Sequence, residues 1–122
     1  MAGKKKIDEK TLRGWLEAWP GVDTDVKWGN DLCFQVAGKM FCVYCLDGEG
    51  KGRLSFKAGD ARFLELTDRP GFHPAPYLAR AHWVKLDEPS MLAPSELQAL
   101  LRHAYELIVA KLPKKTQREL AG

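Results

Sequence analysis

The sequence lacks any apolar run that approaches the ~20 residues of a membrane-spanning helix, so we expect no membrane association. At the N-terminus, Lys4, Lys5 and Lys6 carry positive charge, but no apolar segment follows them as it does in a secretory signal. Cysteine is also scarce, with three residues in the chain, and without a secretory signal these indicate reduced thiols. Together these absences predict a cytoplasmic protein.

Residues that could form a catalytic or metal centre are few and scattered. His73, His82 and His103 fall in a loop, a strand and a helix, without the spacing of metal ligands. Cys42 and Cys45 have CxxC spacing, but on a strand this spacing turns one side chain to each face, with Cys45 toward the core and Cys42 away from it. No second cysteine pair completes a zinc site, and no serine has a base near it in sequence. We therefore expect a non-enzymatic protein with no catalytic residue, no metal and no cofactor.

The length of 122 residues, with 45% hydrophobic and 29% charged residues, suits a single domain. We expect residues 1–7 to be a disordered N-terminus, 8–113 to form the domain and 114–122 to be a polar tail. No repeat or long linker divides the chain, and we expect a monomer. The net charge of +3 is mild, although phosphate contact needs little beyond local positive charge.

Residues 32–46 give the clearest structural pattern, because their character alternates with the period of two expected of a strand with one buried face. Gly38-Lys39 suits a two-residue hairpin turn, with glycine at the position that needs a positive φ. This turn fixes the register and predicts an apolar core face made of Leu32, Phe34, Val36, Phe41, Val43 and Cys45. The opposite face is then mixed and consists of Cys33, Gln35, Ala37, Met40, Cys42 and Tyr44.

Further elements are predicted on both sides of this hairpin from periodicity and from Pro and Gly breaks. Helices are expected over residues 8–19, 61–67 and 95–112, and strands over 22–28, 53–57 and 82–86. Residues 72–77 read as an irregular loop that prolines make stiff. Hairpin-linked strands with helices at both ends of the chain predict an α+β fold, in which one antiparallel sheet of about five strands has helices packed on one face.

The face of this sheet that points away from the core carries the strongest functional signal. Tyr44 and Trp83 are expected there among basic side chains, and aromatic rings between Arg and Lys residues can stack on bases and contact phosphates. The alternative is that both rings are covered by the 72–77 loop or by lysine stems. The nucleic-acid-binding residues that we predict are Lys39 and Lys51 near hairpin tips together with Arg53, Lys57 and Lys85.

Two other functions remain open at this point. The exposed sheet could serve as a protein-interaction module. A small ligand could also bind under the 72–77 loop, in a pocket built from Trp28, His73, Tyr77 and Trp83.

Several short segments, in this order and spacing, resemble the MmcQ/YjbR family of small bacterial proteins. They lie at residues 27–29, 34–41, 54–57, 71–77, 82–84, 104–107 and 111–115. The resemblance covers roughly residues 8–115, with Ala104 standing where the family often has serine before tyrosine. It implies a compact α+β fold similar to that of CyaY and frataxin. It also implies DNA binding through a double-wing arrangement, and it brings no catalytic residues.

Overall fold

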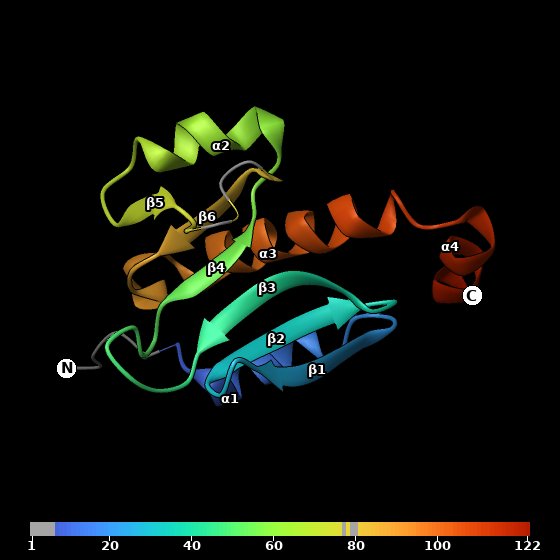
Figure 1. Cartoon of the computed structure of the whole chain (residues 1–122). Coiled ribbons are helices and arrows are strands. Elements are labelled where there is room, and N and C mark those ends of the chain that lie inside the picture. The colour runs from blue at the N-terminus through green and yellow to red at the C-terminus, as the bar shows by residue number, and fades with distance from the viewer. Residues whose placement is uncertain (1–6, 77, 79–80) are drawn as a thin grey trace.

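The computed structural model describes residues 7–76, 78 and 81–122. Helices and strands follow the chain in the order shown in Figure 1: α1 (Glu9–Leu16), β1 (Val22–Lys27), β2 (Asp31–Val36), β3 (Lys39–Cys45), β4 (Leu54–Lys57), α2 (Asp60–Thr67), β5 (Phe72–Pro74), β6 (Trp83–Leu86), the short 3-10 helix η2 (Pro89–Met91), α3 (Pro94–Val109) and α4 (Lys114–Ala121).

The strands form one antiparallel sheet in the order β1-β2-β3-β4-β6-β5, which confirms the predicted α+β class. The sheet has six strands rather than about five, because Phe72–Pro74 pairs with β6. The prediction of an irregular loop over 72–77 was therefore wrong for its first half. Pro74 is tolerated because it ends a strand at the edge of the sheet, where a missing N–H breaks no inner ladder.

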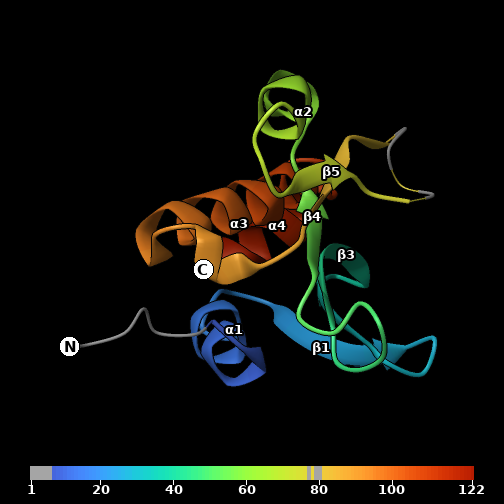
Figure 2. The same ribbon diagram turned by 90° about the vertical axis from the view of Figure 1, so that its left-hand side faces the viewer.

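Helices α1 and α3 lie on one side of the sheet, as the edge-on view in Figure 2 shows. Helix α3 contacts β2, β3 and β4, and α2 packs against β5 and β6. Between helices and sheet lies the core, whose largest fully buried side chains include Phe34, Phe41, Phe56, Leu12, Leu16, Leu32, Leu54, Leu86, Leu97 and Leu101. The opposite side of the sheet carries none of these helices and is called the outer face below.

The β2–β3 hairpin differs from its prediction in both turn and register. Its turn is Ala37-Gly38, with φ of 51° and 78°, and Val36 pairs with Lys39. The register then shifts, so that Gln35 pairs with Met40 but Phe34 pairs with Cys42. The residue between them, Phe41, is the extra residue of a β-bulge, which breaks the period of two.

The bulge reverses the predicted faces of the second half of β3. Cys42 and Tyr44 are buried at 0% and 6% exposure, and Val43 and Cys45 are half-buried on the outer face. The expectations that Val43 and Cys45 point inward, and that Cys42 and Tyr44 point outward, were therefore wrong. Burial raises the pKa of Tyr44, consistent with its place in the core.

Both chain ends also depart from the predicted tails. Ile7 is buried, and its backbone N–H donates to Ser90 Oγ, so the predicted disorder does not extend to this residue; residues 1–6 lie outside the described part of the chain. The segment predicted as a polar tail forms α4. Its Leu120 packs against the core cluster and lies so close to Gly21 that a Cβ there would collide with it.

No helix within the described residues has the length and apolar character needed to cross a bilayer.

Candidate ligand-binding face of the sheet

Strand pairing places one complete row of side chains across the outer face. The row follows the paired residues of all six strands: Asp25, Cys33, Val43, Ser55, Lys85 and His73. Alternation along each strand then adds a further residue of the same face every second position. The outer face therefore has a defined order of charge from one edge of the sheet to the other.

Positive charge gathers on β4 and β6. Arg53 immediately precedes β4, Lys57 ends it, and Lys85 of β6 pairs with Ser55 of β4. Arg53, Lys57 and Lys85 are called the basic half. Among the described residues, no carboxylate lies within 4 Å of any of the three. Lys57 Nζ donates to the Ala81 carbonyl at 3.1 Å. Burial and, after it, the charge of Lys111 lower the pKa of Lys57.

The remaining predicted basic residues lie apart from this group. Lys39 is exposed at the Ala37-Gly38 turn, toward the end of the sheet where β4 finishes. Lys51 lies in the β3–β4 connection and borders a surface hollow with Asp8 and Glu9 of the α1 start. The structure thus brings together three of the predicted nucleic-acid-binding residues, and it places Lys39 and Lys51, the two expected near hairpin tips, away from them.

Negative charge gathers on the opposite half of the outer face. Asp23 and Asp25 alternate along β1, with Lys27 after them, and Asp31 begins β2. Between the two halves lie the side chains of β2 and β3, among them Val43 and Cys33. Cys33 is fully buried, and this burial raises the pKa of its thiol.

The aromatic side chains predicted for this face do not present their rings. Tyr44 belongs to the core, and Trp83 is only 4% exposed. His73 is exposed, but its Nε2 lies 2.8 Å from Asp87 Oδ2. Trp28 behaves differently: it is 70% exposed and has a φ of 53°, in the turn between β1 and β2. The fourth residue of the predicted pocket, Tyr77, lies outside the described residues.

A cavity of about 500 Å³ opens beside Trp28, with Asp31, Met40 and Leu78 also in its wall. These residues come from the β1–β2 turn, the starts of β2 and β3, and the β5–β6 connection. Next to Met40 in the register is Gln35, whose Oε1 is buried without a hydrogen-bond partner in the described part of the chain. Of the predicted pocket residues, Trp28 lines this cavity, whereas His73 and Trp83 are not part of its described wall.

Sequence reasoning missed Asp31 and Leu78 in this cavity. The signal for Asp31 was present, since it precedes Leu32, a predicted core residue, and alternation alone turns it outward. For Leu78 there was no comparable signal, because no periodicity orients a residue in an irregular connection.

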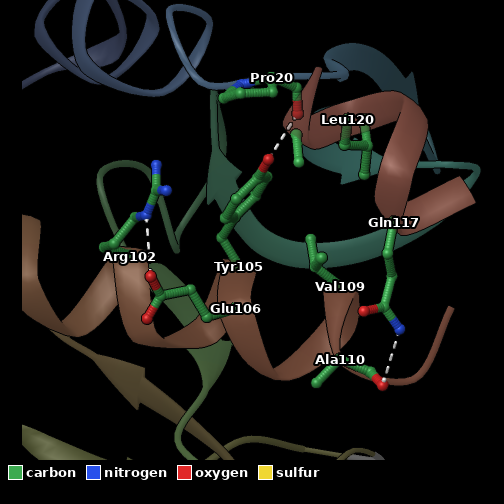
Figure 3. Close-up of a pocket in the computed structure, with 9 residues that line it drawn as sticks. Pro20, Arg102, Tyr105, Glu106, Val109, Ala110, Gln117 and Leu120 are labelled. Atoms are coloured by element: carbon green, nitrogen blue, oxygen red, sulfur yellow. Dashed lines mark hydrogen bonds and ion pairs between the residues drawn. The ribbon is translucent and has the colours of Figure 1, made fainter. Parts of the chain in front are cut away.

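A second cavity of about 350 Å³ lies between α3 and α4 and is drawn in Figure 3. Its polar groups already have partners. Tyr105 donates to the Pro20 carbonyl at 2.6 Å, and Arg102 pairs with Glu106 at 3.2 Å. Gln117 donates to the carbonyls at the end of α3, including that of Ala110. The Gln117 bonds attach α4 to the end of α3, and we assign this cavity to helix packing rather than to ligand binding.

No group of three His, Cys, Asp or Glu side chains suited to a metal ion occurs among residues 7–76, 78 and 81–122.

The fold and the face just described define a class: a small α+β protein with one open antiparallel sheet, helices on one side and a charged, hollowed surface on the other. The YjbR family model matches residues 17–107, and the chain belongs to this family. Among curated proteins, no relative matches the sequence.

Two solved structures share the architecture. The crystal structure of the Deinococcus radiodurans protein DR2400, described with a DUF419 domain, is similar with a TM-score of 0.83 and 24% identity, over 93% of this chain and 88% of that one. A structural-genomics target from Pseudomonas syringae is similar with a TM-score of 0.66 and 16% identity, over 82% of this chain and 97% of that one. At these identities the similarity establishes the shared fold alone.

Proposed function

We propose that this YjbR-family protein binds nucleic acid without catalysing a reaction, and that the basic half of the outer face contacts the phosphates. One observation carries the proposal. Arg53, Lys57 and Lys85 converge on one face, and within the described residues no carboxylate neutralises them at salt-bridge distance. Cations that no carboxylate neutralises are available to phosphate oxygens, and such contacts supply most of the sequence-independent affinity for nucleic acid.

A protein partner on the same face has less support. Protein interfaces depend on a few buried aromatic or Arg anchors near their centre. Tyr44 and Trp83, which would supply such anchors, are covered in the free protein. The centre of the outer face is held by smaller side chains such as Val43 and Ser55.

The test compares two triple variants that remove equal positive charge from different surfaces. In the first, Arg53→Gln, Lys57→Gln and Lys85→Gln neutralise the basic half. In the matched control, three exposed residues of α4 are neutralised: Lys114→Gln, Lys115→Gln and Arg118→Gln. Binding of a fluorescently labelled DNA duplex is measured by anisotropy over a series of salt concentrations.

We expect weaker binding for the basic-half variant at every sequence tested, and little change for the α4 variant. The slope of log K against log salt should fall by about 2.7 in magnitude, because each neutralised contact releases about 0.9 counterion from duplex DNA. Equal losses in both variants would mean that only net charge matters, and the assignment of this face would be wrong.

A further inference from the structure

We propose that the cavity beside Trp28 holds an unpaired base of a single-stranded nucleic acid while the neighbouring phosphates lie over the basic half. This inference rests on the proposed function and specifies its preferred substrate: a single strand, whose unpaired base can enter the cavity, with duplex bound through the basic half alone. It follows from the placement of Trp28, the walls of the cavity and the order of charge across the outer face.

Trp28 occupies a backbone position that does not suit it. Its φ of 53° lies in the left-handed region, where a bulky side chain is a rare outlier. Its ring is 70% exposed and so contributes little to the core, whereas Trp15 and Trp19 pack against the core and Trp83 is buried. An unfavourable conformation that brings no packing indicates a contact outside the folded chain.

The cavity walls suit a flat ring system. Its volume of about 500 Å³ lies within the range of small-molecule sites. The Trp28 indole supplies an aromatic face, while Met40 and Leu78 supply a polarisable thioether and an aliphatic wall. Base stacking on aromatic rings tolerates any base, because every base has a π face.

Among the described residues, the polar groups in the cavity wall or paired with it are acceptors. Asp31 contributes a carboxylate to the wall, and the buried Oε1 of Gln35 is unpartnered in the described part of the chain. A carboxylate repels a phosphate but accepts hydrogen bonds from the amino groups on base edges, as in carboxylate contacts with cytosine N4. The base edge, rather than the phosphate, therefore belongs at Asp31.

The order of charge across the outer face sets the direction in which the nucleic acid lies on the sheet. The carboxylates of Asp23 and Asp25 on β1 repel a phosphate backbone on that side of the sheet, and the basic half attracts it on the other side. Neighbouring strands lie about 4.8 Å apart, so the start of β2 is roughly 10 Å from β4. A base directed from β4 toward Asp31 spans this distance only if it is unstacked and unpaired, which excludes a base inside a duplex.

The experiment uses one labelled oligonucleotide as a single strand and as the stem of a hairpin duplex, with the full chain in both assays. In Trp28→Asn the ring is lost while the residue still tolerates a positive φ, so the fold should be kept, as urea unfolding can verify. Trp28→Phe retains a ring. Leu64→Ala, which truncates a 75% exposed side chain on α2, is the matched control.

We expect Trp28→Asn to weaken single-strand binding by about tenfold, the loss typical of one stacked base, with duplex binding unchanged. Trp28→Phe should restore most of the affinity, and Leu64→Ala should bind as the wild type does. Unchanged single-strand affinity in Trp28→Asn would overturn the inference, as would equal losses for strand and duplex.

The outcome is separable from that of the proposed function. If the basic-half variant weakens both probes while Trp28→Asn weakens neither, phosphate binding stands and the base site is wrong. If a free nucleoside monophosphate binds in a Trp28-dependent way but the oligonucleotide does not, the assignment to a strand is overturned.

Discussion

The bulge at Phe41 can be tested by placing the same charge at two adjacent positions of β3. Cys42 is fully buried on the core side, and its Cα partners are Phe34 and Phe56. Val43 is half-buried on the outer face. An unbroken alternation from a Gly38-Lys39 turn would exchange these two environments, so Cys42→Asp and Val43→Asp distinguish the two registers.

The expected magnitudes differ widely. An uncompensated charge in the core costs at least about 3 kcal/mol. The whole chain of 122 residues should have an unfolding free energy of roughly 6–18 kcal/mol, from about 0.05–0.15 kcal/mol per residue, so this loss is a large share of the total. At Val43 the substitution removes partial burial and strand propensity, which together amount to about 1 kcal/mol.

Urea unfolding followed by circular dichroism measures both variants. We expect Cys42→Asp to shift the midpoint strongly or to prevent folding, and Val43→Asp to shift it slightly. In case the first does not fold, the milder pair Cys42→Ser and Val43→Thr preserves the comparison. A hydroxyl buried without a partner costs about 1–3 kcal/mol, whereas a half-exposed methyl-to-hydroxyl change should stay within about 1 kcal/mol. A larger loss at Val43 than at Cys42 would refute the bulge.

Two further predictions concern the rest of the fold. Gly21→Ala should lower stability by about 1–3 kcal/mol, because Gly21 has a φ of 74° and an added Cβ would collide with Leu120 of α4. The same change at Gly14, which has open space in an exposed turn of α1, should raise stability by about 0.5–1 kcal/mol. Thermal unfolding measures both variants, and equal losses of stability would contradict the explanation. The hydrogen bond from Arg69 lowers the pKa of Glu96, so this pair stabilises the fold above the unfolded-state pKa and its contribution is lost as pH falls through the folded-state pKa. Arg69→Ala should therefore be less stable than the wild type at neutral pH, and the difference should shrink in acid; a difference that is constant over this pH range would contradict the ion-pair explanation.

Much of the fold was predictable because most segments follow simple periodic rules. Periodicity predicted a helix over residues 8–19, and α1 lies there with Leu12 and Leu16 buried and with its Asp8 cap accepting from the Thr11 N–H at 3.1 Å. Alternation also applies on β4 and β6, where Leu54 and Leu86 are buried while Lys57 and Lys85 lie on the outer face. These periodic rules hold in regular helices and strands, where no bulge inserts an extra residue.

The errors arose where local backbone geometry or distant contacts decide the structure. Ala37 adopts a φ of 51° that residue preference would assign to glycine, so the true turn lay one residue before the predicted one. Helix α4 is rich in charge and resembles a solvated tail in sequence. It becomes structured because Leu120 reaches the far end of the sheet near Gly21, a contact between residues distant in sequence.

The bulge also decides where a ligand can find both an aromatic ring and positive charge. With an unbroken strand, Tyr44 would stand on the outer face beside the basic residues of β4, and one small anion with a ring could use both. Tyr44 is in the core, and the exposed aromatic ring within the described residues is that of Trp28, beyond β2. Lys57 remains on β4, and Arg53 immediately before it. A ligand that uses both must span roughly 10 Å across the sheet. An extended strand, with a base at one side and phosphates at the other, meets this requirement, and a compact anion does not.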